Sequence, residues 1–439
     1  MLKRVQLENF KLHASTTIEA APITVFIGPN NSGKSSVFQA LLALRQAFSE
    51  AGRGSSLLLQ SHGDSLQQHA PYLFDERQLI DIGGFEDILR AGQHEVMFGI
   101  SGSIGIPHEH VSRGDIQVSF ECRLRSNSLQ SHTGTLDSDL GHVSWKWSRA
   151  TQEKTVTSDM RVRDLPVTFS PTDNFQMLQV SNIVWPKLPL PQHETTDIHE
   201  LAQFIARTPA SLMHTLHPVF PLRGLEASGY PLPDYSPRNL DRLVLADRTL
   251  ALLARLAYDR DLEEKLANWM QDLIGVRIRI KLIPPKRVTM LCSRTKGSFA
   301  DSLFSNEGTG TNQLPFILAP IGLTPAGETI LLSEPEAHLH PKAQADLLSH
   351  ILTLFERERR QFFIETHSEH VLHSLLHAVA AGRVNKDHLA IYYFERKNGV
   401  AETRRLEVDK KGRVPGGLPG FFEHSIAELA EYLDALKHA

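Results

Sequence analysis

The sequence predicts an α/β fold in which a parallel-sheet core carries an antiparallel β-subdomain and an inserted helical lobe. Three observations lead to this expectation. Near both ends of the chain, short apolar runs end in polar residues and are followed by helical patterns, which is typical of a parallel sheet with crossover helices. Residues 95–185 instead contain short strand-like runs separated by Gly, Ser, Asn and Asp, the pattern of an antiparallel meander. Residues 238–273 have a long helical pattern.

A phosphate-binding loop is predicted between the first strand and the first helix of the core. Residues 23–27 are apolar and β-branched, and the helical pattern that follows has Val37, Leu41 and Leu44 on one stripe. The connecting residues are Gly28, Pro29, Asn30, Asn31, Ser32, Gly33, Lys34, Ser35 and Ser36, which match G-x-x-x-x-G-K-[ST] in full. In such a loop the backbone N–H groups surround phosphate, the lysine neutralises it and the serine after the lysine ligates Mg²⁺. The sequence therefore predicts a site for ATP and Mg²⁺.

Composition limits the class of protein that carries this loop. The chain has 439 residues, 41% hydrophobic and 22% charged, which are the proportions of a globular protein with a large core. Its 46 basic and 50 acidic residues give a net charge of −4, so a nucleic-acid contact requires a local basic patch. Cys122 and Cys292 are far apart and lack metal-ligand spacing. Since no apolar run approaches about 18 residues, we expect a cytoplasmic protein with no membrane partner.

The chain is expected to divide into four segments. They are residues 1–94 (N-terminal part of the core), 95–186 (antiparallel β-subdomain), 187–275 (helical lobe) and 276–439 (C-terminal part of the core). A hairpin at residues 2–21 is expected to lead into the first core strand. A stiff proline-rich stretch at residues 186–191 marks the second boundary. The helical pattern of the lobe is expected to bend or break near Tyr258.

Two later strand ends carry polar residues suited to ATP hydrolysis. The apolar run that begins at Thr329 ends in Ser333-Glu334-Pro335-Glu336-Ala337-His338-Leu339-His340-Pro341. The run that begins at Phe362 ends in Glu365-Thr366-His367-Ser368, and Ser368 is expected to cap the next helix. A phosphate-loop ATPase needs a carboxylate at the carboxyl end of the strand beside the loop strand, where it polarises the attacking water. Glu334 is the predicted carboxylate.

Together these motifs resemble the ATPase heads of the ABC type, specifically the SMC/RecF/OLD-like branch. The resemblance covers residues 1–50 and 300–380, and it rests on the opening Leu7-Glu8-Asn9-Phe10, the loop at 28–35, the turn at 334–341 and Thr366-His367-Ser368. It implies a P-loop NTPase core of the ABC/SMC-head type. The stretch Gly420-Phe421-Phe422-Glu423 also looks like the tail of compact bacterial members. Several such members are AAA-type ATPase components of antiphage defence systems.

The resemblance implies roles for particular residues. Glu334 corresponds to the general base, and His367 to the histidine that hydrogen-bonds the γ-phosphate. The turn at residues 337–341 would cross to a partner subunit. A signature segment, whose backbone and serine reach nucleotide bound by the other subunit, would lie at residues 305–313. Its candidate contacts are Ser305, Gly308, Gly310 and Asn312, and either Ser305 or Asn312 takes the place of the usual serine.

One position departs from the pattern of this branch. Two acidic residues normally precede the proline, and the first supports Mg²⁺ through water, but Ser333 occupies that position here. Because hard cations prefer anionic oxygen, this loss is expected to weaken metal binding and hydrolysis. The sequence therefore predicts a slow ATPase that acts more as a nucleotide-gated switch than as a motor.

The strongest local basic patch lies on a predicted strand. Arg277, Arg279 and Lys281 alternate with apolar residues, and no acidic residue occurs between residues 277 and 300. This pattern is typical of the solvated outer face of a sheet, and it is also a candidate contact with nucleic-acid phosphates.

Three weaker patterns have simpler explanations. The histidines at 338, 340, 367 and 370 could suggest zinc, but the ATPase resemblance already explains their spacing. Arg223 is a candidate arginine finger, although a helix-terminal ion pair is the simpler interpretation. Residues 406–411 faintly resemble a nuclease cluster but lack the upstream acid that two-metal hydrolysis requires, so a charged hairpin turn is expected.

The predicted function is that of an ATPase which forms a dimer or a larger ring around nucleotide. It would act as the sensor or scaffold of a bacterial antiphage defence system and control a separate effector, often a nuclease. The tail after His367 is expected to be too short for the nuclease domain of OLD-like proteins. The alternatives are a RecF/SMC-like repair ATPase that clamps DNA, a transporter ATPase subunit, and a nearly inactive nucleotide-gated scaffold. The turn at 334–338 resembles the soluble branch and argues against the transporter.

Overall fold

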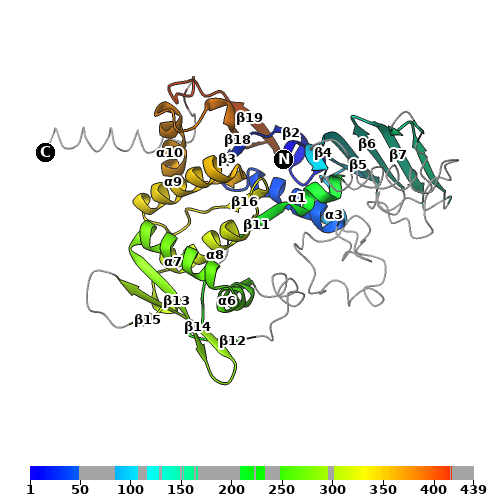
Figure 1. Ribbon diagram of the computed structural model, residues 1–439. Coiled ribbons are helices and arrows are strands. Elements are labelled where there is room, and N and C mark those ends of the chain that lie inside the picture. Colours follow the sequence, from blue (N-terminus) through cyan, green and yellow to red (C-terminus); the bar gives the residue numbers. More distant parts are fainter. Residues whose placement is uncertain are drawn as a thin grey trace, which may run out of the picture. The chain divides into compact units, whose positions relative to one another are not determined.

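A computed structural model gives the fold of the chain (Figure 1). It describes residues 1–48, 85–106, 116–127, 131–148, 151, 153–162, 165–166, 208–221, 224–232, 248–294, 301–415 and 417. The chain forms two compact units. The first unit comprises Met1–Ala20, Ser35–His217 and Lys397–Glu402, and the second comprises Ala21–Lys34, Pro218–Arg396 and Thr403–Ala439.

The first unit contains a seven-stranded sheet in the order β2-β1-β4-β5-β6-β7-β8, with every adjacent pair antiparallel. Its strands are β1 (Leu2–Phe10), β2 (His13–Glu19), β4 (Glu95–Ile106), β5 (Ile116–Asn127), β6 (Ser131–Ser138), β7 (Gly141–Ser148) and β8 (Lys154–Ser158). The predicted hairpin is confirmed as β1 and β2, with Asn9 and Lys11 at φ of 54° and 50° in its turn. The predicted meander is confirmed in β4, β5, β7 and β8.

Two details of this sheet differ from the sequence prediction. Strand β6 was not predicted, because Ser, His, Thr and Asp dominate its sequence and leave little apolar alternation. The predicted segment boundary between residues 94 and 95 does not separate the antiparallel sheet from the N-terminal segment, because β4 pairs with β1. The strand predicted at 177–180 and the helix predicted at 196–206 lie outside the described residues.

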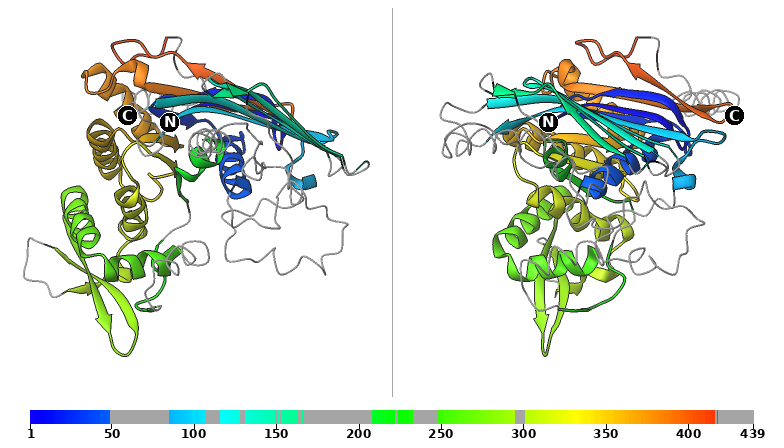
Figure 2. Two further views of the ribbon diagram at one scale, coloured as in Figure 1. Left: turned by 45° about the vertical axis from the view of Figure 1, so that its right-hand side comes forward. Right: turned by 90° about the vertical axis from the view of Figure 1, so that its right-hand side faces the viewer.

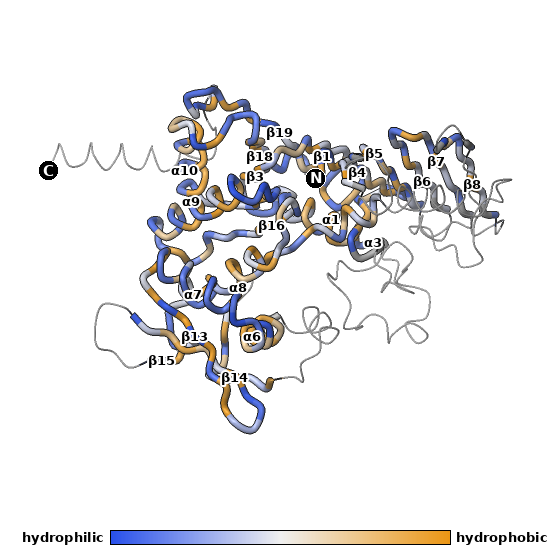
Figure 3. Tube along the Cα trace, in the orientation of Figure 1, coloured by the Kyte–Doolittle hydropathy of each residue, from blue (hydrophilic) through white to orange (hydrophobic). Residues whose placement is uncertain are grey.

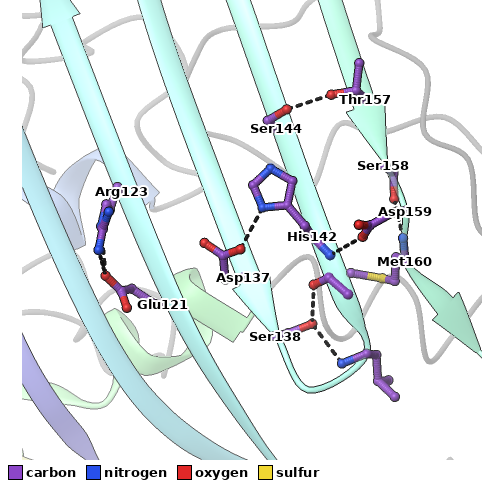
Figure 4. A network of polar contacts seen from close by, with 12 residues as sticks. Glu121, Arg123, Asp137, Ser138, His142, Ser144, Thr157, Ser158, Asp159 and Met160 are labelled. Atoms are coloured by element: carbon purple, nitrogen blue, oxygen red, sulfur yellow. Dashed lines mark hydrogen bonds and ion pairs between the residues drawn. The ribbon is translucent and has the colours of Figure 1, made fainter.

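The far strands of this sheet are joined by polar side chains (Figure 4). His142 Nδ1 lies 2.7 Å from Asp137 Oδ1, and the hydroxyls of Ser144 and Thr157 lie 2.6 Å apart. The backbone N–H of His142 donates to Asp159 Oδ1 at 2.6 Å. These contacts link β6 to β7 and β7 to β8, so cross-strand pairs stabilise a part of the sheet whose sequence is largely polar.

The second unit is built on a six-stranded sheet in the order β11-β16-β17-β3-β18-β19. Its strands are β11 (Leu216–Val219), β16 (Thr329–Ser333), β17 (Gln361–Glu365), β3 (Ile23–Ile27), β18 (Leu389–Lys397) and β19 (Val400–Leu406). The four strands from β16 to β18 are parallel. All residues of β3 and β17 are buried, as expected for central strands with both faces covered. The α/β fold class is thereby confirmed.

Three helices of the second unit connect or follow these strands. They are α8 (Thr309–Leu323), α9 (Pro341–Glu358) and α10 (Glu369–Ala380), while α1 (Lys34–Phe48) begins at the lysine of the predicted loop. The stripe of α9 that carries Leu347, Ile351 and Leu354 is buried, as is the stripe of α10 with Val371 and Leu375. Ser368 caps α10 as predicted, since its hydroxyl accepts a bond from the N–H of Val371 at 3.2 Å.

The predicted helical lobe contains two helices, α6 (Arg248–Tyr258) and α7 (Arg260–Ile274), and the predicted break at Tyr258 is confirmed. Asp259 separates them and caps α7, because its side chain accepts from the N–H of Leu262 at 3.0 Å. A hairpin of β13 (Val276–Ile283) and β14 (Arg287–Arg294) follows, and both views in Figure 2 show it extending beyond α6 and α7.

Several short elements are also present. They are α3 (Phe85–Ile88), β9 (Arg161–Val162), β10 (Leu165–Pro166), β12 (Tyr230–Pro231), β15 (Ser302–Leu303), and the 3₁₀ turns η4 (Phe304–Asn306) and η5 (Lys386–His388). Strands β12 and β15 both pair with β14, so the β13–β14 hairpin widens into a four-stranded sheet. None of the described helices combines the length and the apolarity needed to span a membrane.

Two strand glycines provide a test of the first unit. Gly134 of β6 is buried opposite Trp145 of β7, and a Cβ at this glycine would lie 2.1 Å from the indole ring. We expect Gly134→Ala to lower the free energy of unfolding by about 1–3 kcal/mol, because the indole must move. Gly105→Ala in β4 is the matched control, since no atom lies within 4 Å of that added Cβ. Denaturant unfolding measures both, and equal stabilities would contradict the packing of β6 on β7.

Candidate functional site

The loop after β3 has the backbone geometry of a phosphate-binding loop. Gly28 has φ of 140° and Gly33 has φ of 103°, a region that favours glycine, and Asn31 has φ of 58°. A Cβ at Gly28 would lie 2.1 Å from the carbonyl oxygen of Phe394 on β18. The first glycine of the motif is therefore required both by its conformation and by the adjacent strand.

Lys34 is held inside this loop. Its side chain is 3% exposed, and Nζ donates to the carbonyl oxygens of Gly28 at 3.0 Å and Pro29 at 2.8 Å. Ser32 Oγ lies 3.4 Å from Nζ. Burial lowers the pKa of Lys34, and the nearby carboxylates of Glu365, Glu334 and Glu336 oppose that shift, in this order of strength. The loop therefore positions the Lys34 amine, and carboxylates at the ends of two other strands offset its positive charge.

Those acids lie at the carboxyl ends of β16 and β17. The strand beside β3 is β17, and β16 is the next one out, so the prediction that the Glu334 strand neighbours the loop strand is wrong. In register, Glu365 faces Ser333 of β16 on one side and Phe26 of β3 on the other. Glu365, which sequence analysis left without a role, thus ends the strand that lies directly against the loop strand. Its signal in the sequence was an acid closing an otherwise apolar run.

Glu334 and His367 lie next to each other. Glu334 Oε1 lies 3.5 Å from His367 Nε2, and the N–H of Glu334 donates to the carbonyl oxygen of Glu365 at 2.8 Å. Glu334 has φ of 45°, a left-handed conformation uncommon for a non-glycine residue, and its side chain is 39% exposed. One potential ligand atom from each of Glu334, Glu365 and His367 lies within 4.8 Å of the others. The exposed glutamate can therefore contact a substrate, while the histidine lies beside it.

The same environment controls the charge of His367. Burial lowers its pKa, the Lys34 cation lowers it further, and Glu334 and a backbone hydrogen bond with Gly28 oppose these effects. Its imidazole is therefore kept neutral to lower pH than an ordinary histidine and offers one donor and one acceptor nitrogen.

Glu336 ties the two strand ends together and was also missed. It is 8% exposed, and its Oε1 accepts from Thr366 Oγ1 at 2.7 Å and from the N–H of His367 at 2.9 Å. Its Oε2 is buried and has no hydrogen-bond partner among the described residues. Burial raises the pKa of this carboxyl group, while its hydrogen bonds oppose the rise. Glu336 thus fixes the backbone that carries His367.

A hollow opens beside these residues. It is lined by Glu334, Glu336, Ala337, Gln344, His367, Ser368, Glu369 and His370. Ser368 Oγ and Gln344 Oε1 lie 2.6 Å apart, and the amide of Gln344 donates to the carbonyl oxygen of Leu339 at 2.9 Å. The wall made by the turn at 337–341 is therefore bonded to α9, and Gln344 of α9 in turn contacts Ser368 at the start of α10.

The predicted signature segment lies against this turn. Gly310 approaches the carbonyl oxygen of His338 so closely that a Cβ would lie 2.3 Å from it, and the amide of Gln313 donates to the carbonyl oxygen of Ala337. Gly308 is the N-cap of α8, exposed and without a side-chain cap. The N-terminus of α8 therefore presents backbone N–H groups close to the Glu334 turn.

The structure separates the two candidates for the signature serine. Asn312 uses both ends of its amide on Leu225, accepting from the N–H at 2.8 Å and donating to the carbonyl oxygen at 2.9 Å. This pairing gives Asn312 a structural role within its own unit. Ser305 lies in the turn η4, partly exposed, and is the better-placed candidate.

The basic strand is confirmed as an alternating strand, but its charge is partly paired. Along β13 the side chains of Arg277, Arg279 and Lys281 are exposed and alternate with apolar residues. Figure 3 shows hydrophilic and hydrophobic stretches along this hairpin. Arg277 donates to Asn268 at 2.8 Å, and Arg279 forms an ion pair with Asp301. The acid-free window in the sequence therefore does not produce an acid-free surface, because Asp301 folds back onto the strand.

The structure describes two of the three weaker sequence patterns, the histidines and the charged cluster at residues 406–411. Among the described residues, the only His/Cys/Asp/Glu group close enough to hold a metal contains His367 and neither His338 nor His340. Asp409 accepts from the N–H groups of Lys411 and Arg413, so the charged cluster near the C-terminal end is a tight turn as predicted. Arg223 lies outside the described residues.

Three family models match parts of the chain. An AAA ATPase domain matches residues 1–82, and an AAA domain described as a putative AbiEii toxin of a type IV toxin–antitoxin system matches residues 226–373. A protein of unknown function (DUF3696) matches residues 384–431. The two AAA matches cover the loop and both strand ends of the site, so the predicted relation to phosphate-loop ATPases is confirmed.

Solved structures of SMC heads are also similar to this chain. An SMC head bound to the C-terminal winged-helix domain of ScpA is 13% identical, with a TM-score of 0.46, and the match covers 93% of this chain and 98% of that one. The SMC head domain from Thermotoga maritima is 14% identical, with a TM-score of 0.39 and coverages of 93% and 99%. An SMC head of Pyrococcus furiosus bound to the C-terminal domain of ScpA is 11% identical, with a TM-score of 0.43 and coverages of 98% and 99%. No curated protein matches.

The two glycines of the signature segment differ in a way that can be measured. We expect Gly310→Ala to lower the melting temperature by several degrees, because the new methyl group collides with the backbone of the Glu334 turn. Gly308→Ala is the matched control, since nothing lies within 4 Å of its added Cβ. Calorimetry distinguishes them, and a Gly310→Ala protein as stable as the Gly308→Ala protein would refute the contact between α8 and the turn.

The lowered pKa of His367 predicts a pH dependence of stability. The unfolded chain binds a proton at this residue at higher pH than the folded chain, so stability is lost as pH falls through the ordinary histidine range. We expect His367→Gln to reduce the loss of the urea midpoint between about pH 7.5 and 5.5, the range around the reference pKa. His370→Gln, at an exposed position three residues on, is the control. An unchanged pH dependence in His367→Gln would contradict the burial of this ring beside Lys34.

Proposed function

We propose that this protein binds and hydrolyses ATP at the carboxyl ends of β3, β17 and β16. The observation that carries the proposal is the convergence of Lys34, Glu334 and His367, from three separate segments of the chain, around one phosphate-binding loop. The donor set fits Mg-ATP: a buried ammonium group for phosphate oxygens, carboxylates for a hard cation, and a glycine whose missing Cβ leaves room for the loop. Ser35, which follows Lys34 directly, would ligate Mg²⁺ and lower the negative charge of the phosphates there.

Each residue has one expected action. Lys34 exchanges its loop carbonyl partners for β- and γ-phosphate oxygens and neutralises their charge. Glu334, exposed and at 3.5 Å from His367, accepts the proton of the attacking water. Neutral His367 donates a hydrogen bond to the γ-phosphate. Glu336 holds the backbone N–H of His367 and so fixes the distance between this histidine and Glu334.

The assembly around the nucleotide is expected to be shared between subunits. The exposed N-terminus of α8, at Gly308, is a polar anion site that supports a contact with the nucleotide of a second copy. Ser305 and Gly310 flank it, and the wall at residues 337–341 lies against it. We therefore propose a dimer, or a larger ring, in which each ATP lies between the Lys34 loop of one subunit and the α8 N-terminus of another.

In its cell, such an ATPase would act as the nucleotide-gated sensor or scaffold of a defence system that holds a separate effector. The match of residues 226–373 to a model of the AbiEii type supports this role. The alternative, a DNA-clamping repair ATPase, is supported by the exposed basic side chains of β13. The two differ in salt-sensitive, ATP-dependent DNA binding, which only the clamp requires.

The solution mass of Glu334→Gln protein tests the composite site. This change removes the general base and leaves the loop intact, so Mg-ATP is expected to raise the mass by at least one protomer. Adding Gly308→Asp should abolish that step, because a carboxylate at the exposed cap repels phosphate, while the isosteric control Gly308→Asn should preserve it, since both residues cap helices well. A solution mass that does not change with ATP in any variant would refute the shared site.

The expectation of a slow, nucleotide-gated switch has its own test. Wild-type turnover well above about 1 s⁻¹ would refute it.

A further inference from the structure

We propose that Glu365 supplies the metal-supporting carboxylate that Ser333 does not, so that the Mg²⁺ site has moved by one strand within the sheet. This inference rests on the proposed ATP site. It assigns to Glu365 a positioning role, in which the carboxylate holds the water shell of Mg²⁺ rather than reacting itself. The protein would then keep a metal-dependent nucleotide site despite the loss of the usual acid, whatever its rate of turnover.

The register of the parallel sheet makes this exchange possible. Ser333 is the last residue of β16 and Glu365 is the last residue of β17, and the two are direct partners across the ladder. Partners in a parallel ladder project to the same face of the sheet, so a carboxylate on either strand can serve the same edge. Because β17 lies between β16 and β3, Glu365 is one strand closer to the phosphate-binding loop than residue 333 is.

The surroundings of Glu365 support a charged role at this edge. It is 2% exposed, and buried carboxylates are costly unless cations or hydrogen bonds compensate them. Its carboxylate also belongs to the group with Glu334 and His367 whose ligand atoms lie within 4.8 Å of one another. These three residues come from two adjacent strand ends that face the loop.

A separate observation points to a polar ligand beside this group. Glu336 Oε2 is buried without a hydrogen-bond partner among the described residues, and Glu336 lines the same hollow as Glu334 and His367. An orphan carboxylate oxygen at such a place is satisfied by a hydrated cation or its water. The donor set is all oxygen apart from His367, which suits Mg²⁺, an ion that keeps several of its waters and binds through few carboxylates.

Outer-shell carboxylates have measurable effects on metal affinity, and their loss typically costs about 10–100-fold. We would titrate a fluorescent, non-hydrolysable ATP analogue against the protein at a series of free Mg²⁺ concentrations, with EDTA as the metal-free reference. Four proteins are compared: wild type, Glu365→Gln, Ser333→Asp, and the double variant with both changes. Thermal unfolding checks each protein, and Glu365→Asp, which keeps the charge but shortens the side chain, is used if Glu365→Gln does not fold.

The expected result is specific to the metal. Mg²⁺ is expected to tighten nucleotide binding. Glu365→Gln should raise the Mg²⁺ concentration at which this gain in affinity is half-maximal by about 10–100-fold. Metal-free affinity should stay equal or become tighter, because a negative charge near the phosphates is lost. Ser333→Asp in the Glu365→Gln background should restore most of the Mg²⁺ response, since the acid returns to the partner position of the ladder. Glu365→Asp should give an intermediate midpoint.

Other outcomes would overturn the inference in distinct ways. An Mg²⁺ midpoint that Glu365→Gln leaves unchanged would remove Glu365 from the metal site. Equal weakening with Mg²⁺ and with EDTA would show that Glu365 only positions Lys34 as its counter-ion. Failure of Ser333→Asp to restore the response would refute the exchange between strands. If wild-type protein binds no nucleotide even with Mg²⁺, the proposed function fails as well.

Discussion

The candidate site depends on one constraint, the parallel register of β16, β17 and β3. Parallel strands end at the same edge of a sheet, so residues that follow each strand are brought together although at least 300 positions separate the loop at residues 28–34 from Glu334 and His367. The hydrogen-bond ladder sets the spacing of these ends, and the buried residues of β3 and β17 fix it. Shifting one strand by a residue would turn its terminal acid to the opposite face.

Around that edge, charges balance each other across strand ends. The ammonium of Lys34 is buried among loop carbonyls. The free-energy cost of removing this cation from water is offset by the three carboxylates that lie near it. Burial and the same ammonium lower the pKa of His367, and Glu336 uses one oxygen to fix the backbone of that histidine. The site is therefore one electrostatic unit in which the state of each group depends on the others.

A second constraint acts on the backbone near the Glu334 turn. Glu334 and His338 both have positive φ, and Gly310 lies directly against the carbonyl oxygen of His338. Such conformations persist only where the surroundings over-determine them, and here the contacts of the turn with α8, with α9, and with Thr366 and His367 provide that support. The turn that carries the predicted general base is thus connected directly to the helix that carries the predicted signature segment. A displacement of either one has a direct physical route to the other.

The sequence by itself determined the elements whose signals are local. The phosphate-binding loop, the break at Tyr258, the cap at Ser368 and the alternating face of β13 follow from side-chain chemistry over a few residues, and the structure has them all. Only the tertiary structure decided the order of the strands, because hydrogen bonding between distant segments leaves no local pattern. Long-range packing likewise engaged Asn312 with Leu225 and brought Asp301 onto the basic strand, while the strand order placed β17, not β16, beside β3. It also gave Glu365 its position opposite Ser333, which neither residue's neighbours in the chain could reveal.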